Sequence, residues 1–195
     1  NESYALAKIA GIKLCQSLRK QYNFDAISLM PSNLYGPFDN YNYENSHVLP
    51  ALIRKFSEAR KNNLLSVSCW GTGTPLREFL YVDDLADACI FVLENWDPNS
   101  NNAPKDLNKN PLSWINVGSK YEISIKDLAF KISAEVGYKG DIIWDSSKPD
   151  GTPRKKLNCN RLTKLGWEAK TNLNEGIKLT LESYKKELAN NRCRT

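Results

Sequence analysis

The chain has 195 residues, a net charge of +5, 41% hydrophobic residues and 25% charged residues, a composition typical of a soluble globular protein. Its lysines and arginines are interspersed with acidic residues, which argues against a nucleic-acid-binding stripe and favours anionic small molecules such as nucleotides. No apolar run approaches the about 20 residues of a membrane span, and one His and five cysteines without C-x-x-C spacing argue against a metal site.

Helical and strand patterns alternate from the start of the chain. Apolar residues at helical spacing predict a helix over residues 2–21, with Ser3 as its N-cap. A strand is predicted over residues 25–30, closed by Pro31. The polar segment 32–46 is too long for a simple turn and is therefore a candidate functional loop.

The same periodicities predict the remaining elements. In chain order these are a helix over 48–62, a strand over 65–70, a turn over 71–75, a strand over 77–82, a helix ending at Glu94, a strand over 115–118, a helix over 125–136, a strand over 142–144, a turn over 148–154 and a helix over 173–188. Asp83 or Asp84 is expected to cap the helix that ends at Glu94, and Ser124 the helix that follows. Segment 95–111 is expected to be a surface loop. Alternating short strands and helices predict an α/β fold.

Tyr4 and Lys8 lie four residues apart on the first predicted helix. Residues i and i+4 share one face of a helix, and an ammonium group beside a phenol favours the phenolate because opposite charges attract. The pair could therefore be an acid/base tyrosine with its lysine partner, and Lys8 could also bind ribose hydroxyls. On spacing alone, an ordinary surface pair is the commoner explanation in a chain with nine tyrosines.

Three separated segments together resemble one family. "YALAKIAGIKLC" is similar to the catalytic helix of the extended short-chain dehydrogenase/reductase family, "MPSNLYGPFDN" to the strand and loop after that helix, and "REFLYVDDLADA" to part of the substrate lobe. The resemblance implies the C-terminal part of a Rossmann-like protein, with the end of its parallel sheet and a small α/β substrate-binding lobe. It implies that residues 1–36 are a remnant of the NADP-binding domain, and that residues 37–195 are mainly the substrate lobe, with some segments returning to the sheet.

The segments "SHVLPALIRKF", "CWGTGTPLREFLYVDDLADA" and "SKPDGTPRKKL" resemble family members that epimerise and reduce a GDP-linked 4-keto-6-deoxy sugar with NADPH. The implied catalytic residues are Tyr4, Lys8 and His47. The implied contacts of NADP(H) are Tyr4, Lys8, Pro31, Ser32, Asn33, Leu34 and His47. The implied contacts of the GDP-sugar are Lys55, Trp70, Arg77 and Asp150. Lys55 stands where close relatives carry Arg, so it keeps the charge but lacks the bidentate fork.

His47 is the only His in the chain. A lone His is commonly a surface or core residue, but this one ends a polar loop beside an apolar helix, and imidazole side chains in general can exchange protons near neutral pH. Epimerisation beside a ketone needs a base to remove a proton and an acid to return it on the other face. The resemblance assigns this work to His47 and to a Cys expected upstream of residue 1, so none of the five cysteines inherits that role.

Each substrate candidate also has a plain structural explanation. Trp70 could lie in the core, Arg77 could pair with Glu78 or Asp83, and segment 148–154 could be merely a turn. The two functional alternatives are another nucleotide-sugar epimerase or dehydratase of the same family, and a non-catalytic module that binds nucleotide-sugars. No G-x-G-x-x-G occurs in the chain, so the glycine-rich cofactor turn of the family is expected upstream.

The chain begins at Asn1 and its only Met is Met30. We therefore expect a piece of a longer protein, inactive alone because hydride chemistry needs a bound cofactor, and a homodimer when full length. No signal peptide is visible at the start, and unpaired cysteines fit the reducing cytoplasm. The apolar side chains of Ile9, Ile12, Leu29 and Met30 are expected to be exposed.

Overall fold

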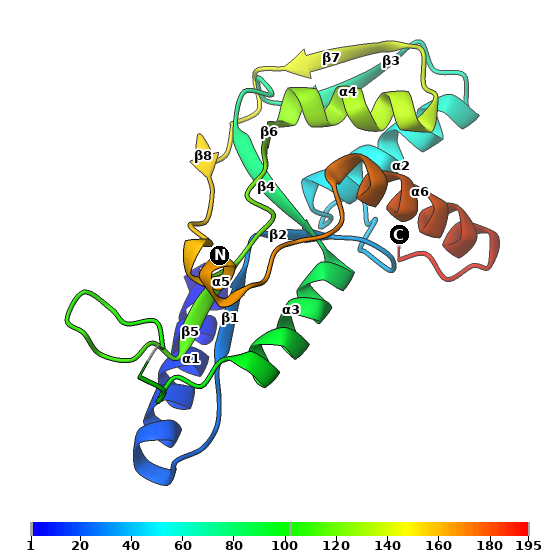
Figure 1. The fold of residues 1–195 in the computed structure, drawn as a ribbon. Coiled ribbons are helices and arrows are strands. Elements are labelled where there is room, and N and C mark those ends of the chain that lie inside the picture. Colours follow the sequence, from blue (N-terminus) through cyan, green and yellow to red (C-terminus); the bar gives the residue numbers. More distant parts are fainter. Residues whose placement is uncertain (1, 102, 195) are drawn as a thin grey trace.

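A computed structural model describes residues 2–101 and 103–194 of the chain, which form two hydrophobic cores and are drawn in Figure 1. The helices are α1 (Glu2–Tyr22), α2 (Val48–Lys61), α3 (Val82–Asn95), α4 (Ile125–Val136), α5 (Asn160–Leu165) and α6 (Leu173–Ala189). The strands are β1 (Ser28–Pro31), β2 (Asn33–Tyr35), β3 (Ser66–Trp70), β4 (Leu76–Tyr81), β5 (Trp114–Val117), β6 (Glu122–Ser124), β7 (Asp141–Asp145) and β8 (Arg154–Lys155).

Strand β4 has different partners along its length. Its last three residues pair in parallel with β2, with Asn33 opposite Phe79. Its first three residues pair with antiparallel β6, and Leu76 and Arg77 also pair with parallel β8. Two further parallel pairs, β1 with β5 and β3 with β7, complete the sheets among the described residues. Parallel pairing requires crossover connections, and α2, α3 and α4 lie in these connections.

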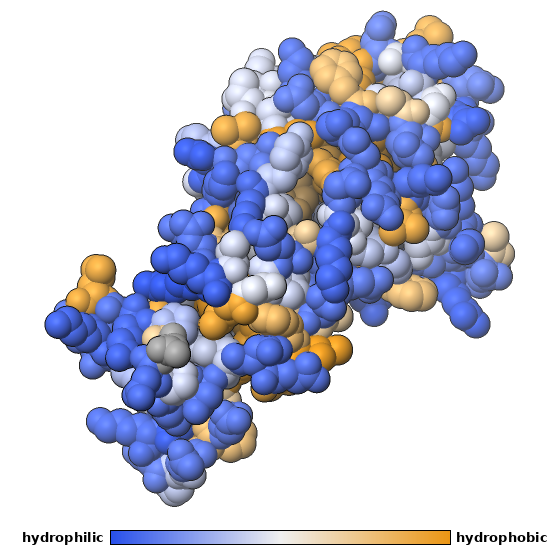
Figure 2. Space-filling view, in the orientation of Figure 1, coloured by the Kyte–Doolittle hydropathy of each residue, from blue (hydrophilic) through white to orange (hydrophobic). Residues whose placement is uncertain are grey.

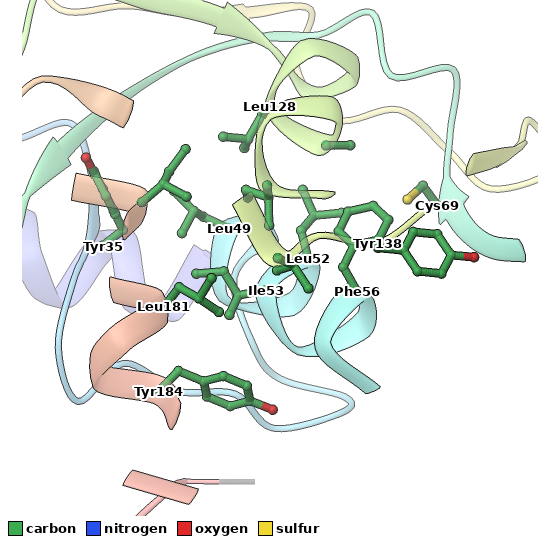
Figure 3. Packing of buried hydrophobic residues seen from close by; sticks show 14 of the residues in the cluster. Tyr35, Leu49, Leu52, Ile53, Phe56, Cys69, Leu128, Tyr138, Leu181 and Tyr184 are labelled. Carbon is green, nitrogen blue, oxygen red and sulfur yellow. The ribbon is translucent and has the colours of Figure 1, made fainter. Parts of the chain in front are cut away.

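The first core is built mainly by α2, α4 and α6 against β3 and β4. The predicted apolar face of α2 is confirmed, because Leu49, Leu52, Ile53 and Phe56 are all buried. Figure 3 shows these side chains between Leu128 of α4 and the residues Leu181 and Tyr184 of α6. Removal of these apolar surfaces from water is the main stabilising term for this half.

The second core lies around β1, β5, α3 and α5. Ala88 and Val92 of α3, Val117 of β5 and Leu162 of α5 are fully buried there. Successive side chains of a strand point to opposite faces. Phe79 and Tyr81 of β4 therefore enter the first core while Leu80 enters the second, so β4 belongs to both.

Several predicted boundaries and elements differ from those in the structure. Helix α1 begins at Glu2, so Ser3 lies inside it and is not its N-cap. The strand predicted over 25–30 is restricted to Ser28–Pro31. Strand β2 lies within the segment predicted to be a loop, because pairing with β4 gives its three residues their hydrogen bonds. Strands β6 and β8 and helix α5 were not predicted.

The caps of α3 and α4 have different outcomes. Tyr81 is the N-cap of α3, and Asp83 and Asp84 lie in its first turn, so the prediction that either one caps it is wrong. The side chain of Asp84 is buried and accepts hydrogen bonds from the backbone N–H groups of Lys170 and Thr171. The prediction for α4 is confirmed, because the Ser124 hydroxyl accepts the Asp127 N–H at 3.0 Å.

Helix α1 buries none of its side chains. Ile9 and Met30 are exposed as expected, whereas Ile12 and Leu29 are half-buried and Leu29 packs against the second core. Figure 2 shows hydrophobic surface over the part of the molecule that holds β1, β5 and α3. Within the described ranges, no helix combines the length and the apolar character needed to cross a membrane.

Candidate functional site

Helix α1 brings Tyr4 and Lys8 together as their spacing predicts. The Lys8 ammonium lies 5.4 Å from the centroid of the Tyr4 ring. Both side chains are exposed, Tyr4 at 68% of its surface, so a ligand can reach the phenol and the ammonium from the same side. A phenol with a neighbouring cation can exchange a proton with a bound group.

The segment Pro31–Leu34 runs from the end of β1 into β2. Pro31 lies opposite Val117, the last residue of β5, and the Ser32 N–H donates to the Val117 carbonyl at 2.9 Å. The Asn33 side-chain amide donates to the backbone carbonyl of Glu78 at 2.8 Å. The segment therefore lies at the carboxyl ends of two parallel strands, which is where ligands bind in open α/β sheets.

The side chain of Glu78 holds two loop segments beside this site by hydrogen bonds. Glu78 was not identified as a functional residue from the sequence. Its side chain is fully buried, and its two carboxylate oxygens accept the backbone N–H groups of Lys120 at 2.8 Å and Leu157 at 2.9 Å. These bonds satisfy a buried charge that would otherwise be costly. The available sequence signal was an acidic residue in the otherwise apolar strand pattern "EFLYV".

His47 is the N-cap residue of α2, with an exposed side chain that makes no capping hydrogen bond. Asp39 lies close enough for the two charges to interact. Burial raises the pKa of Asp39, while the Asn40 N–H, which it accepts at 2.7 Å, and the charge of His47 oppose that rise. The imidazole is therefore accessible to a ligand and has a carboxylate nearby.

Trp70 ends strand β3 and is not a core residue, because 69% of its surface is exposed. The ammonium groups of Lys55 and Lys148 lie 5.8 and 5.7 Å from its ring centroid. Lys55 is further held by donating to the Ser68 carbonyl at 3.0 Å. An exposed indole with two adjacent cations can stack on a planar base and attract an anion.

Asp150 docks onto the turn after Trp70. The backbone N–H and hydroxyl of Thr72 donate to the two Asp150 oxygens at 2.9 and 2.6 Å, and these bonds lower the pKa of Asp150. Gly71 has a φ of +77°, and a Cβ there would collide with the Asp150 carboxylate. Segment 148–154 is therefore not merely a turn, because it is hydrogen-bonded to the turn at Gly71 and Thr72. The two segments together form a corner of the surface beside Trp70.

The Arg77 guanidinium lies next to Gly151 of this corner. Its guanidinium donates to the Leu76 carbonyl at 2.8 Å, and a side chain at position 151 would contact it. Within residues 2–101 and 103–194, it forms no ion pair with Glu78 or Asp83. The structure thus brings Trp70, Arg77 and Asp150 around one turn, with Lys55 beside Trp70.

Comparisons with known proteins show the family of the chain. Residues 1–108 match the model of the NAD dependent epimerase/dehydratase family. The chain is 53% identical over 185 residues to "Probable GDP-L-fucose synthase 1" of Oryza sativa subsp. japonica, covering 95% of the chain and 52% of that protein. It is 50% identical over 188 residues to "GDP-L-fucose synthase" of Escherichia coli (strain K12), covering 94% and 56%.

Solved structures show the same fold. A GDP-L-fucose synthetase from Naegleria fowleri superimposes with a TM-score of 0.84 at 26% identity, covering 98% of this chain and 56% of that one. A GDP-6-OMe-4-keto-L-xylo-heptose reductase from C. jejuni gives 0.82 at 34% identity, covering 95% and 61%.

The chain spans about half the length of the curated relatives it matches. Its fold is a mixed α/β, Rossmann-like arrangement with parallel strand pairs and helices. Because the family model matches more than half of its residues, the chain belongs to the NAD dependent epimerase/dehydratase family.

Proposed function

We propose that the protein containing this chain is an NADPH-dependent GDP-L-fucose synthase, which epimerises GDP-4-keto-6-deoxy-D-mannose at C3 and C5 and reduces C4. The observation that carries the proposal is the corner at which Asp150 binds Thr72, between Trp70 and Arg77. The identity of about 50% with relatives of that name supports it.

The corner suits a guanosine diphosphate. The Arg77 guanidinium carries five N–H donors and can bind the diphosphate, which guanidinium groups recognise well. Trp70 can stack on guanine. Asp150 retains lone pairs beyond those that Thr72 occupies and can accept from guanine or ribose. Lys55 can add positive charge beside Trp70, without the two-pronged geometry of an arginine.

The first helix and the segment after β1 suit NADP(H). The exposed Tyr4 hydroxyl and Lys8 ammonium share one face, and with His47 and the segment Pro31, Ser32, Asn33 and Leu34 they would hold the nicotinamide end. When bound, the cofactor supplies the hydride for C4. Tyr4 would donate a proton to the C4 oxygen. Lys8 would favour the phenolate by its charge and bind ribose hydroxyls.

His47 would be an acid/base of the epimerisation. Its exposed imidazole can remove a proton from a carbon beside the ketone or return one to it. The charge of Asp39 interacts with that of His47 and would stabilise the imidazolium that forms when the proton is taken up.

We propose that residues 1–36 contribute to a cofactor domain and residues 37–195 mainly to a GDP-sugar lobe. The pairing of β5 with β1 supports a return of the chain to the first domain. We also propose that the full-length protein is a cytoplasmic homodimer; the five free cysteines of this chain support a reducing compartment. By themselves, these 195 residues should not turn over substrate.

The proposal is tested by product analysis with GDP-4-keto-6-deoxymannose and NADPH on the full-length protein. Tyr4→Phe should abolish reduction and His47→Gln should mainly impair epimerisation, whereas Tyr22→Phe, at the exposed other end of α1, should change neither. A product other than GDP-L-fucose would favour another epimerase or dehydratase, and normal turnover by His47→Gln would refute its role. Turnover by the 195 residues alone would refute their inactivity.

A further inference from the structure

The loop that carries His47, residues 36–47, is held by the C-terminal part of the chain. Phe38 has a φ of +61°, an unfavourable conformation for a side-chain-bearing residue, and its N–H donates to Glu187 Oε1 at 3.0 Å. Glu187 lies on α6, is only 4% exposed, and accepts the Ser183 hydroxyl on the same oxygen at 2.7 Å. A buried carboxylate therefore fixes the strained residue at the start of the loop.

Tyr41 forms a second attachment. Its side chain is completely buried, and its ring centroid lies 4.4 Å from that of Tyr184, one turn before Glu187 on α6. Its N–H donates to the Arg194 carbonyl at 2.8 Å. Figure 1 shows α6 and the C-terminal end beside the segment that leads from β2 to α2, and Figure 3 shows Tyr184 projecting from α6 toward that segment.

Asparagine side chains connect these attachments with His47. Asn40 Oδ1 accepts the Asn42 N–H at 3.0 Å, and Asn42 Oδ1 accepts the Asn45 N–H at 3.1 Å. The Asn40 amide donates to the Asn45 carbonyl at 3.3 Å. Such side-chain bonds to nearby backbone fix turn geometry, so the position of Asn40 determines that of Asn45, two residues before His47.

We infer that Glu187 is a positioning residue for His47: by holding Phe38 it sets the path of the loop that presents the imidazole. The inference rests on the proposed function. It assigns Glu187 no contact with substrate. It also predicts that loss of Glu187 affects epimerisation and not hydride transfer. Loss of its oxygen displaces the epimerisation group and leaves Tyr4 and Lys8, on α1, in place.

The experiment compares two replacements of similar length in the full-length protein. Glu187→Gln keeps a carbonyl oxygen for both the Phe38 and Ser183 bonds, whereas Glu187→Met fills the same space without an acceptor. Glu182→Met, on the exposed side of α6, is the matched control. Epimerisation is measured as exchange of solvent deuterium into the carbons beside the ketone of GDP-4-keto-6-deoxymannose. Hydride transfer is measured separately as oxidation of GDP-L-fucose by NADP⁺.

Glu187→Met should slow deuterium exchange by about tenfold or more, since small misplacements of reacting groups are costly, and leave oxidation within about twofold of wild type. Glu187→Gln should retain most exchange, and Glu182→Met all of it. Equal losses in both reactions, or unchanged exchange in Glu187→Met, would overturn the inference. If Glu187→Met does not fold, truncation after residue 191, which removes the Arg194 carbonyl, should give the same selective loss.

A wild-type protein that catalyses neither reaction would refute the proposed function, and the positioning role with it. A wild-type protein that catalyses both, combined with equal effects of Met and Gln at position 187, would refute the positioning role alone.

Discussion

Replacement of Trp70 by Ala should weaken nucleotide binding much more than it lowers the stability of the fold. The indole is 69% exposed, so about a third of its surface is buried. Truncation of a fully buried Trp costs about 3–5 kcal/mol, and a third of that is about 1–1.7 kcal/mol. In a protein domain of this size, each kcal/mol lowers the melting temperature by about 2–4 °C, so the expected decrease is about 2–7 °C.

The effect on nucleotide binding should be larger. Stacking of one base on an aromatic side chain contributes about 1–3 kcal/mol, and a factor of ten in affinity corresponds to about 1.4 kcal/mol. Trp70→Ala should therefore weaken GDP binding by between about 5-fold and 150-fold. The Lys55 and Lys148 ammonium groups beside the ring would remain, so binding should be weakened but not abolished.

Calorimetric titration of the full-length protein with GDP measures the affinity, and thermal unfolding of the same samples measures stability. Tyr22→Ala is the control, because Tyr22 is a comparably exposed aromatic residue, at 72%, on the last turn of α1. A GDP affinity within about twofold of wild type would refute the stacking role, given the range above. A loss of more than about 3 kcal/mol of stability would refute the reasoning from exposure.

Three further predictions concern stability and reactivity. Phe56→Ala, which empties a fully buried position, should lower the free energy of unfolding in urea by about 3–5 kcal/mol; a loss below about 1 kcal/mol would contradict the packing. Burial raises the pKa of Cys159 to about 11, so at about pH 8 iodoacetamide should label the exposed Cys89 and spare Cys159, as peptide mass spectrometry would show. Hydrogen bonds from Arg154 lower the pKa of Glu122 from 4.5 to about 2, so its contribution to stability is present above pH 4.5 and lost as the pH falls toward 2. Glu122→Gln should flatten the acid side of the curve of stability against pH, and an unchanged curve would contradict the pairing.

Elements with a strong local pattern could be predicted from the sequence. The apolar face of α2 and the Ser124 cap of α4 depend on residues within one or two turns of each other. Strand β2 could not be predicted, because its three residues pair with residues 46 positions later, at Phe79 to Tyr81. Asp83 or Asp84 was expected to cap α3, and the sequence gives no sign of the N–H groups of Lys170 and Thr171 that Asp84 binds instead.

In the candidate site too, residues linked by local sequence pattern could be predicted, and residues joined by distant contacts could not. The Tyr4–Lys8 pair follows from helical geometry, and Trp70 and Arg77 flank one predicted turn. The contact between Thr72 and Asp150 joins residues 78 positions apart, so only the family resemblance suggested Asp150. Glu78 was missed because a sequence cannot show that the N–H groups of Lys120 and Leu157 converge on one buried carboxylate.

The bond between Phe38 and Glu187 also has a consequence for synthesis on the ribosome, because it spans 149 positions. At translation rates of about 5–20 residues per second, the loop is made roughly 7–30 s before its partner emerges. Closing so long a segment costs only about 0.6 kcal/mol more than closing one of half its length. The long separation therefore delays formation of the contact but lowers the stability of the folded protein very little. The nascent chain therefore completes the first core and the loop of His47 only after α6 has been synthesised.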